Sequence, residues 1–223
     1  MKKVLLLVIT IATFGTLKAQ DGLYAGAQFG YYLVGMSNGP ATLSNASNTN
    51  AYTHFKGKYS TKEGLSVGYG ILSFLAVQAE LNFATLGQAS TGNYGSSTLT
   101  RDINLNYVEI PIFLKLRTPG EAMHYYFMIG PQFNFLSSAS ITDPANVNIS
   151  DAKSHFNSTD MGLTFDTGAE LQIEKIMINL GLRGYYGFSD PNVTAFQLAN
   201  TSGAYSSSHN FAVGLSLGAH YNF

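Results

Sequence analysis

The sequence predicts an all-β protein: a single eight-stranded antiparallel up-and-down transmembrane β-barrel with short periplasmic turns and long extracellular loops. Three observations lead to this prediction. Apolar residues alternate with polar or small residues along repeated segments, as in strands with two different faces. The connections between these segments are alternately tight and long. Finally, one face of the segments is nearly free of charge, whereas the opposite face carries ionisable residues.

The composition narrows the class of protein further. Charged residues make up 11% of the 223 residues, against about 25% in an average soluble domain. Hydrophobic residues make up 45%, yet the mean hydropathy is only +0.06, because Gly (23) and Tyr (14) take the place of charge. These values exclude a helical membrane protein and a charge-driven nucleic-acid binder, so no nucleic-acid partner is expected. With Cys 0, no disulfide can form.

Residues 1–19 have the pattern of a secretory signal peptide. Lys2 and Lys3 precede an apolar run over 4–17, and Ala19 stands just before the expected cleavage point. The apolar run is shorter than the roughly 20 residues that a membrane-spanning helix needs. We therefore expect export of a single mature domain over residues 20–223. Its first residue, Gln20, is not Cys, which disfavours a lipid anchor.

Eight segments alternate, and each is predicted as a strand by its apolar positions. In the first three strands these are the odd-numbered residues of 23–33, 65–71 and 75–83, and in the fourth the even-numbered residues of 108–116. In the fifth they are the odd-numbered residues of 123–135 apart from Pro131, and in the sixth those of 163–173. The seventh has Ile176, Ile178, Leu180, Leu182 and Tyr186, and the eighth the odd-numbered residues of 211–223.

The connections place the strand ends on two sides of a membrane. The links near 72–74, 118–122 and 174–175 are tight, which is typical of periplasmic turns. The links at 36–58, 87–102, 137–158 and 189–208 are long and rich in Ser, Asn, Thr and Gly, so we expect extracellular loops there, available to a protein partner. Both chain termini then lie in the periplasm of a Gram-negative bacterium.

The polar face is expected to form the lumen. A soluble sandwich would bury it, but it carries too many ionisable groups for a sandwich core: Glu80, Glu109, Lys115, Arg117, Asp166, Glu170 and Arg183. In a barrel that spans lipid, apolar side chains face outward and polar ones face the lumen. Most of the strand glycines share the polar face, as a narrow eight-stranded lumen requires. The sequence therefore predicts a plugged polar lumen.

One ion pair follows from a hairpin register. If Glu174 and Lys175 form a two-residue turn, Ile173 faces Ile176 and Asp166 faces Arg183. The remaining members of the predicted lumen network are Glu80, Glu109, Lys115 and Glu170. Such a network could conduct protons or ions, or it could fill the lumen and fix the register. We favour the second interpretation, because buried charge is tolerated when it is paired.

Aromatic residues at outward positions gather near the predicted strand ends. This distribution is typical of the aromatic girdles at membrane interfaces, although Tyr and Phe favour strands generally. The residues are Tyr31, Phe133, Phe135, Tyr186, Phe188 and Phe211 on the loop side, and Tyr125, Tyr221 and Phe223 on the turn side.

Several stretches resemble the PorT-like outer-membrane β-barrel family of Bacteroidetes. NLNYVEIPIFLK (104–115) and FMIGP (127–131) resemble its central signature, with VQAELNF (77–83), GLTFDTGAELQI (162–173) and GLSLGAHYNF (214–223) around them. The resemblance implies an outer-membrane barrel, some members of which serve protein secretion or surface assembly. Tyr221 and Phe223 also resemble the C-terminal signal recognised by the barrel assembly machinery. The segment around Thr167 and Gly168 departs from the family pattern, which is usually richer in Gly.

No catalytic motif, phosphate loop or metal-ligand spacing is present in the sequence, so no cofactor, metal or catalytic residue is assigned. His54, His155 and His209 fall in three different long links and could converge above the barrel. Three hypotheses remain. We favour a non-enzymatic barrel in outer-membrane lipid whose loops serve binding, envelope integrity, or a secretion or assembly system. The alternatives are an outer-membrane enzyme that modifies lipid or peptide, and a narrow channel.

Overall fold

A computed structural model of the protein describes residues 22–37, 52–94, 97–120, 122–142, 151–193 and 207–223. The predicted signal peptide, residues 1–19, lies outside this range. No helix in the described part is long and apolar enough to cross a membrane. The elements are β1 (Leu23–Ser37), β2 (Tyr52–Lys56), β3 (Lys58–Leu72), β4 (Leu75–Tyr94), β5 (Ser97–Arg117), β6 (Met123–Thr142), the 3-10 helix η1 (Ala152–His155), β7 (Thr159–Ile173), β8 (Ile176–Gly187) and β9 (His209–Asn222).

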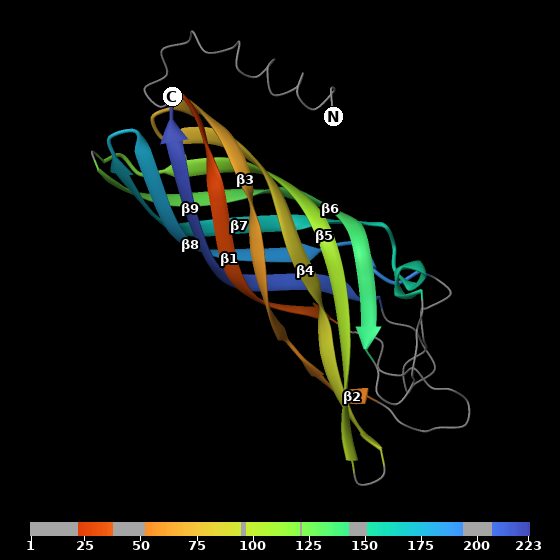
Figure 1. Cartoon of the computed structure of the whole chain (residues 1–223). Coiled ribbons are helices and arrows are strands. Elements are labelled where there is room, and N and C mark those ends of the chain that lie inside the picture. Colours follow the sequence, from red (N-terminus) through yellow and green to blue (C-terminus); the bar gives the residue numbers. More distant parts are fainter. Residues whose placement is uncertain (1–21, 38–51, 95–96, 121, 143–150, 194–206) are drawn as a thin grey trace.

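The strands form one closed antiparallel barrel, shown in Figure 1. Their order is β2-β4-β3-β1-β9-β8-β7-β6-β5, and an additional pairing between β4 and β5 closes the ring. The short β2 pairs only with β4, so the other eight strands make the barrel wall. The predicted fold class, an eight-stranded up-and-down barrel, is confirmed.

The pairing of β7 with β8 has the register expected from the sequence. Ile173 faces Ile176 and Asp166 faces Arg183 across the two strands. The turn between them uses Glu174, whose φ is 52°, a left-handed conformation that matches the twist of a tight hairpin. The first and last strands also pair, from Tyr24 with Asn222 to Ser37 with His209, so the wall has no open edge there.

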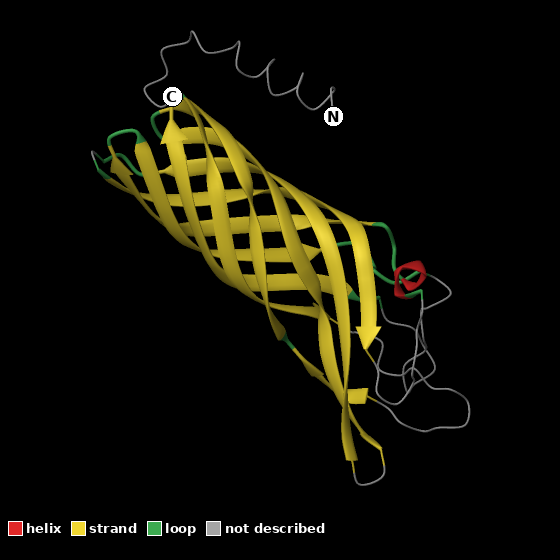
Figure 2. Cartoon of the chain, in the orientation of Figure 1, coloured by secondary structure: helices red, strands yellow, loops and turns green. Residues whose placement is uncertain are grey.

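The two ends of the barrel differ. At one end, which we call the turn end, lie the C-terminal end of β9 and the tight turns, drawn in green in Figure 2. At the other, the loop end, lie η1, β2 and a hairpin of β4 and β5 that extends well past the rest of the wall (Figure 1).

The prediction of a loop over residues 87–102 is wrong. β4 runs to Tyr94 and β5 starts at Ser97, and the two pair from Gly87 with Asn104 to Tyr94 with Ser97. The composition suggested a loop because this hairpin is rich in Ser, Thr, Asn and Gly. Its alternating buried side chains, among them Gln88, Ser90 and Arg101, nevertheless give it the two faces of a strand pair.

The other long links also begin or end in regular structure. β2 occupies the end of the 36–58 link, and residues 38–51 lie outside the described range. β6 extends into the 137–158 link as far as Thr142, and η1 follows the segment 143–150, which is not described. In the 189–208 link, Asn192 forms an isolated bridge with Phe156, and residues 194–206 are not described.

Inward positions are crowded. A Cβ placed on Gly130 would lie 1.8 Å from the Ile112 carbonyl oxygen, and one on Gly168 would lie 2.1 Å from that of Leu180. Neither contact can be relieved by a side-chain rotation, because both involve backbone atoms of the neighbouring strand. Glycine at these positions therefore lets the strands of a narrow barrel pack closely.

Candidate functional site: a paired ionic network in the lumen

Arg183 is buried in the lumen and binds two carboxylates. Its Nε donates to Asp166 Oδ2 at 2.7 Å. Its Nη1 and Nη2 donate to the two oxygens of Glu80 at 2.7 and 3.0 Å, a bidentate arrangement. All three side chains are almost completely buried. The pair of Asp166 and Arg183 derived from the hairpin register is thus part of a triad that joins β4, β7 and β8.

Neutral side chains complete the hydrogen bonds of the triad. Asp166 accepts hydrogen bonds from the Tyr126 hydroxyl at 2.9 Å and the Ser216 hydroxyl at 2.8 Å. Glu80 accepts from the amides of Gln78 at 2.8 Å and Asn82 at 3.0 Å. Buried charge of this kind is stable only when each ion has both a counter-charge and hydrogen-bond partners, and the triad meets both conditions.

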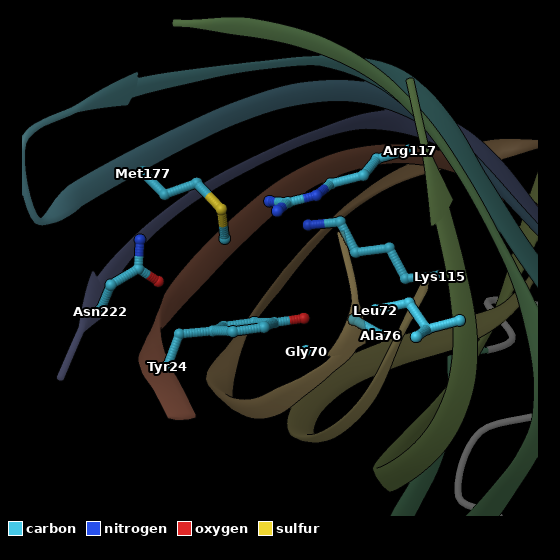
Figure 3. A pocket seen from close by; sticks show the side chains of 8 residues that line it. All are labelled: Tyr24, Gly70, Leu72, Ala76, Lys115, Arg117, Met177 and Asn222. Atoms are coloured by element: carbon cyan, nitrogen blue, oxygen red, sulfur yellow. The ribbon is translucent and has the colours of Figure 1, made fainter. Parts of the chain in front are cut away.

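A second ionic group lies towards the turn end. Glu170 forms ion pairs with Lys115 and, at 3.5 Å, with Arg117. The Lys115 ammonium also lies over the rings of Tyr24 and Tyr126, 5.5 and 5.3 Å from their centres. Figure 3 shows Lys115 and Arg117 pointing into a small pocket that is partly open to solvent. It is lined by Tyr24, Gly70, Leu72, Ala76, Lys115, Arg117, Met177 and Asn222.

The third ion pair joins Lys62 and Glu109, at 2.5 Å. Sequence reasoning included Glu109 but missed Lys62, because the second predicted strand was started at Gly64, whereas β3 starts at Lys58. Lys62 has the same alternation as Gly64 and Ser66, so extending the strand by one more pair of residues would have placed it in the lumen. The structure thus distributes the six predicted network residues over three separate ionic groups.

Towards the loop end the lumen also contains an apolar cluster, which the sequence analysis did not anticipate. Eleven buried side chains pack together there, with partly buried Ala139, Ile141 and Val193 against them. Phe156 belongs to this cluster although it lies in a link rather than in a strand. The loop-end cluster consists of Tyr32, Val34, Met36, Leu86, Ile103, Leu105, Tyr107, Leu136, Phe156, Tyr185 and Ala212.

The outer wall is apolar, with aromatic side chains near both ends. Tyr31 stacks on Tyr59, with ring centres 5.4 Å apart and planes 4° apart, and Tyr221 makes an edge contact with Phe223 at 5.3 Å. Leu180, Leu215 and similar side chains between the ends are largely exposed. Such an apolar band with aromatic borders is the surface that a bilayer covers.

His155 and His209 have separate environments. His155 lies in η1, where its Nδ1 is 3.0 Å from the Asp151 carbonyl oxygen, and His209 packs on Tyr186 with ring centres 5.6 Å apart. His54 lies in β2, and the structure describes only the backbone pairing of this strand. Over the described ranges, no group of three or more His, Cys, Asp or Glu side chains could hold a metal ion.

A closed antiparallel barrel with an apolar outer band, aromatic borders and a charged lumen defines an outer-membrane type of β-barrel protein. The comparisons agree with this class. Residues 18–191 match the family described as outer membrane protein beta-barrel domain, and the chain belongs to that family. Family membership supports a location in the outer membrane.

A solved structure shows the same fold, and a second is similar to this chain over most of its length. Neisserial surface protein A, from Neisseria, is 14% identical with a TM-score of 0.51, over 91% of this chain and 97% of that one. The outer membrane protein OprG from Pseudomonas aeruginosa is 13% identical with a TM-score of 0.49, over 93% of this chain and 99% of that one. No curated protein matches this chain in sequence.

The Arg183 triad gives a stability prediction. Arg183→Met should destabilise the barrel by about 3 to 5 kcal/mol, because Asp166 and Glu80 are both left buried without a cation. Adding Asp166→Asn should restore only part of this loss, since Glu80 stays charged. The triple variant with Glu80→Gln as well should recover most of it. The measurement is the urea midpoint of unfolding. Unfolding is monitored by the different mobilities of the folded and unfolded forms on unboiled gels. Equal midpoints for wild type and Arg183→Met would show that the triad does not stabilise the fold.

Proposed function

We propose that this protein is a non-enzymatic outer-membrane barrel with a closed lumen, which binds a partner through the sheet that projects from its loop end. The observation that carries the proposal is the division of the chain into two parts. Paired ions and packed side chains fill the barrel, while β4 and β5 continue past it with β2 and the end of β6 alongside. Transport through the lumen does not require such an extension. The extension does, however, present a surface outside the membrane to which a partner can bind.

The outer face of the projecting sheet supports a binding role because it is polar where the barrel wall is apolar. Asn106 Nδ2 donates to the Ser138 hydroxyl at 2.9 Å, and the Thr85 hydroxyl donates to Asn106 Oδ1 at 2.6 Å. Lys58 binds the side-chain oxygen of Asn104. This row of amides and hydroxyls lies on paired strands rather than on loops, so its geometry is fixed before a partner binds, which lowers the entropic cost of binding.

We further propose that the loop end is extracellular and that both termini lie in the periplasm. Short turns at one end and long connections at the other support this orientation. The resemblance to PorT-like proteins adds the proposal that the partner belongs to a secretion or envelope-assembly system. Leader cleavage after Ala19 is likewise a proposal, carried by the sequence pattern.

The closed lumen predicts that the protein does not conduct ions. Purified protein inserted into planar bilayers should show no steady conductance, because the Arg183 triad and the pairs of Lys115 and Lys62 occupy the lumen at three levels. Heat-denatured protein, added in the same detergent, serves as the control for leakage. Reproducible steady conductance, with an ion selectivity that Arg183→Met alters, would instead establish the channel hypothesis.

The projecting sheet predicts a protein contact at Thr100, an exposed residue of β5. A photo-reactive amino acid at this position should give a discrete crosslinked protein on intact cells. The same amino acid at Leu180, which is 57% exposed on the apolar wall, should react with lipid only and is the matched control. If the variants at Thr100 and Leu180 give the same crosslinked products, the sheet is not the binding surface.

The last strand predicts a role for Tyr221 and Phe223 in assembly. Both are outward, 45% and 71% exposed, at the turn end. Tyr221→Asp, or removal of Phe223, should lower the amount of folded barrel in the membrane, as measured by quantitative blotting of outer-membrane fractions. Tyr125→Asp is the control, because Tyr125 is also an outward aromatic residue of the turn end, 62% exposed, but not in the last strand. An equal loss in Tyr125→Asp would reduce the role of Tyr221 to interfacial packing.

A further inference from the structure

Glu63 is an acidic residue on the outer wall of the barrel. Along β3, Lys62 and Ser66 are buried in the lumen, whereas Glu63 and Leu65 are exposed on the opposite face. Over the described part of the eight wall strands, below the projecting sheet, Glu63 is the only Asp, Glu, Lys or Arg side chain that points outward. Sequence reasoning missed it because the second predicted strand was started at Gly64.

Glu63 lies close to the loop-side border of the apolar band, but still inside the band. The band starts at the turn end, where Ile71, Leu72 and Phe74 are exposed. β3 runs from Glu63 down to Leu72. At about 3.3 Å per residue and a strand tilt of about 40°, this stretch spans roughly 23 Å of a band that is about 25 Å tall. An ionisable side chain that faces lipid is costly, so its presence indicates a functional contact.

No described side chain of this protein neutralises Glu63. Within the described residues the ion pairs involve the carboxylates of the lumen, and none involves Glu63. Its neighbour in sequence, Lys62, points into the lumen and binds Glu109. Across the two neighbouring strands Glu63 faces Phe29 of β1 and Phe83 of β4, which are 49% and 54% exposed. A counter-charge for this carboxylate therefore has to come from another molecule.

The side chains around Glu63 form a surface on which a protein can pack. On the loop side of Glu63, the exposed rings of Tyr31 and Tyr59 stack on each other. On the turn side, Ala27 lies opposite Leu65, which is largely exposed. Rigid exposed rings provide contact area, and a small residue lets the backbone of a partner approach the wall closely. β1, β3 and β4 carry this surface and lie side by side in Figure 1. We call it the Glu63 face, and it consists of Ala27, Phe29, Tyr31, Tyr59, Glu63 and Phe83.

We propose that the Glu63 face binds a membrane-spanning segment of a partner protein, and that a basic residue of this segment pairs with Glu63. Arginine fits best, because its guanidinium group donates two parallel hydrogen bonds to a carboxylate and also stacks on aromatic rings. Phe29 and Phe83 offer such rings on the two sides of Glu63. Both interactions are stronger in the apolar band than in water, because the local dielectric constant is lower.

A second copy of this chain does not fit as the partner. The described outward face of the wall has no Lys or Arg, so two copies in contact through their walls would leave Glu63 without a counter-charge. A lipid headgroup has no fixed position and gains nothing from the packing surface around Glu63. The partner is therefore a different protein, and its contact lies in the plane of the membrane. This contact goes beyond the function proposed above, which concerns the projecting sheet.

Photo-crosslinking on intact cells tests the proposal. A photo-reactive amino acid at Leu65, the next outward residue of β3, should give one discrete adduct with another membrane protein. Glu63→Gln should reduce this adduct about tenfold or more without lowering the amount of folded barrel, because it removes the charge and keeps the size. Glu174→Gln alters an exposed carboxylate of the turn between β7 and β8 and should leave the adduct unchanged. The same photo-reactive amino acid at Phe165 is the positional control and should react with lipid only, since β7 lies opposite β3 in the strand order.

A double-variant experiment then tests the ion pair itself. Mass spectrometry of the adduct identifies the segment of the partner, and changing its basic residue to Gln should reduce the adduct as much as Glu63→Gln does. Combining the two changes should cause no further loss, because each of them removes the same ion pair.

Several results would overturn the proposal. An adduct that Glu63→Gln leaves unchanged would show that the carboxylate does not hold the partner. Adducts with lipid alone would assign Glu63 to a headgroup, and an adduct with a second copy of this chain would contradict the choice of partner. A partner segment without Lys or Arg, or additive losses in the double variant, would exclude the ion pair. The Thr100 experiment is independent, because a negative result there overturns the role of the projecting sheet and leaves the Glu63 face untouched.

Discussion

Closure of the backbone ladder is the constraint on which the rest of this structure depends. Hydrocarbon offers no hydrogen bonds, so each strand must be paired on both sides where lipid surrounds it. The pairing of β1 with β9 and of β4 with β5 removes the last open edges. Closure also sends alternate side chains into a space only a few residues wide, while their neighbours face lipid. The apolar wall, the small inward residues and the buried ions all follow from it.

Because the lumen is narrow, each charged side chain inside it must be paired with an opposite charge. Water cannot screen a side chain that is enclosed by eight strands, so an ion in this space needs a counter-ion on another strand. Arg183 illustrates this well, because its planar group satisfies Glu80 and Asp166 simultaneously and thereby links strands far apart in the chain. Such links also fix the register, since a shift by one residue would place these ions in lipid.

Much of this architecture was predictable from the sequence, because one physical rule, alternation, acts on every strand. Register could be derived where a tight turn fixes it, as between β7 and β8, and this placed Asp166 opposite Arg183. Alternation says nothing about pairs across the lumen, so the contact of Arg183 with Glu80 could not be derived. The projecting hairpin was missed for a related reason. Polar inward residues such as Gln88 and Ser90 have the composition of a loop, and the predicted strands were ended where their apolar pattern weakened.

The apolar cluster at the loop end explains how the ion pairs of the lumen are shielded from water at that end. A plug of ions would hydrate at its ends, and hydration weakens ion pairs by raising the local dielectric constant. Packing Leu86, Leu105 and Phe156 across the loop end keeps water from the Lys62 pair beneath, and the same side chains anchor the base of the projecting sheet. The sheet is therefore continuous with the barrel through both strand pairing and packed side chains. Its stability depends on the same packing, so the filled loop end of the barrel and the projecting sheet share one core.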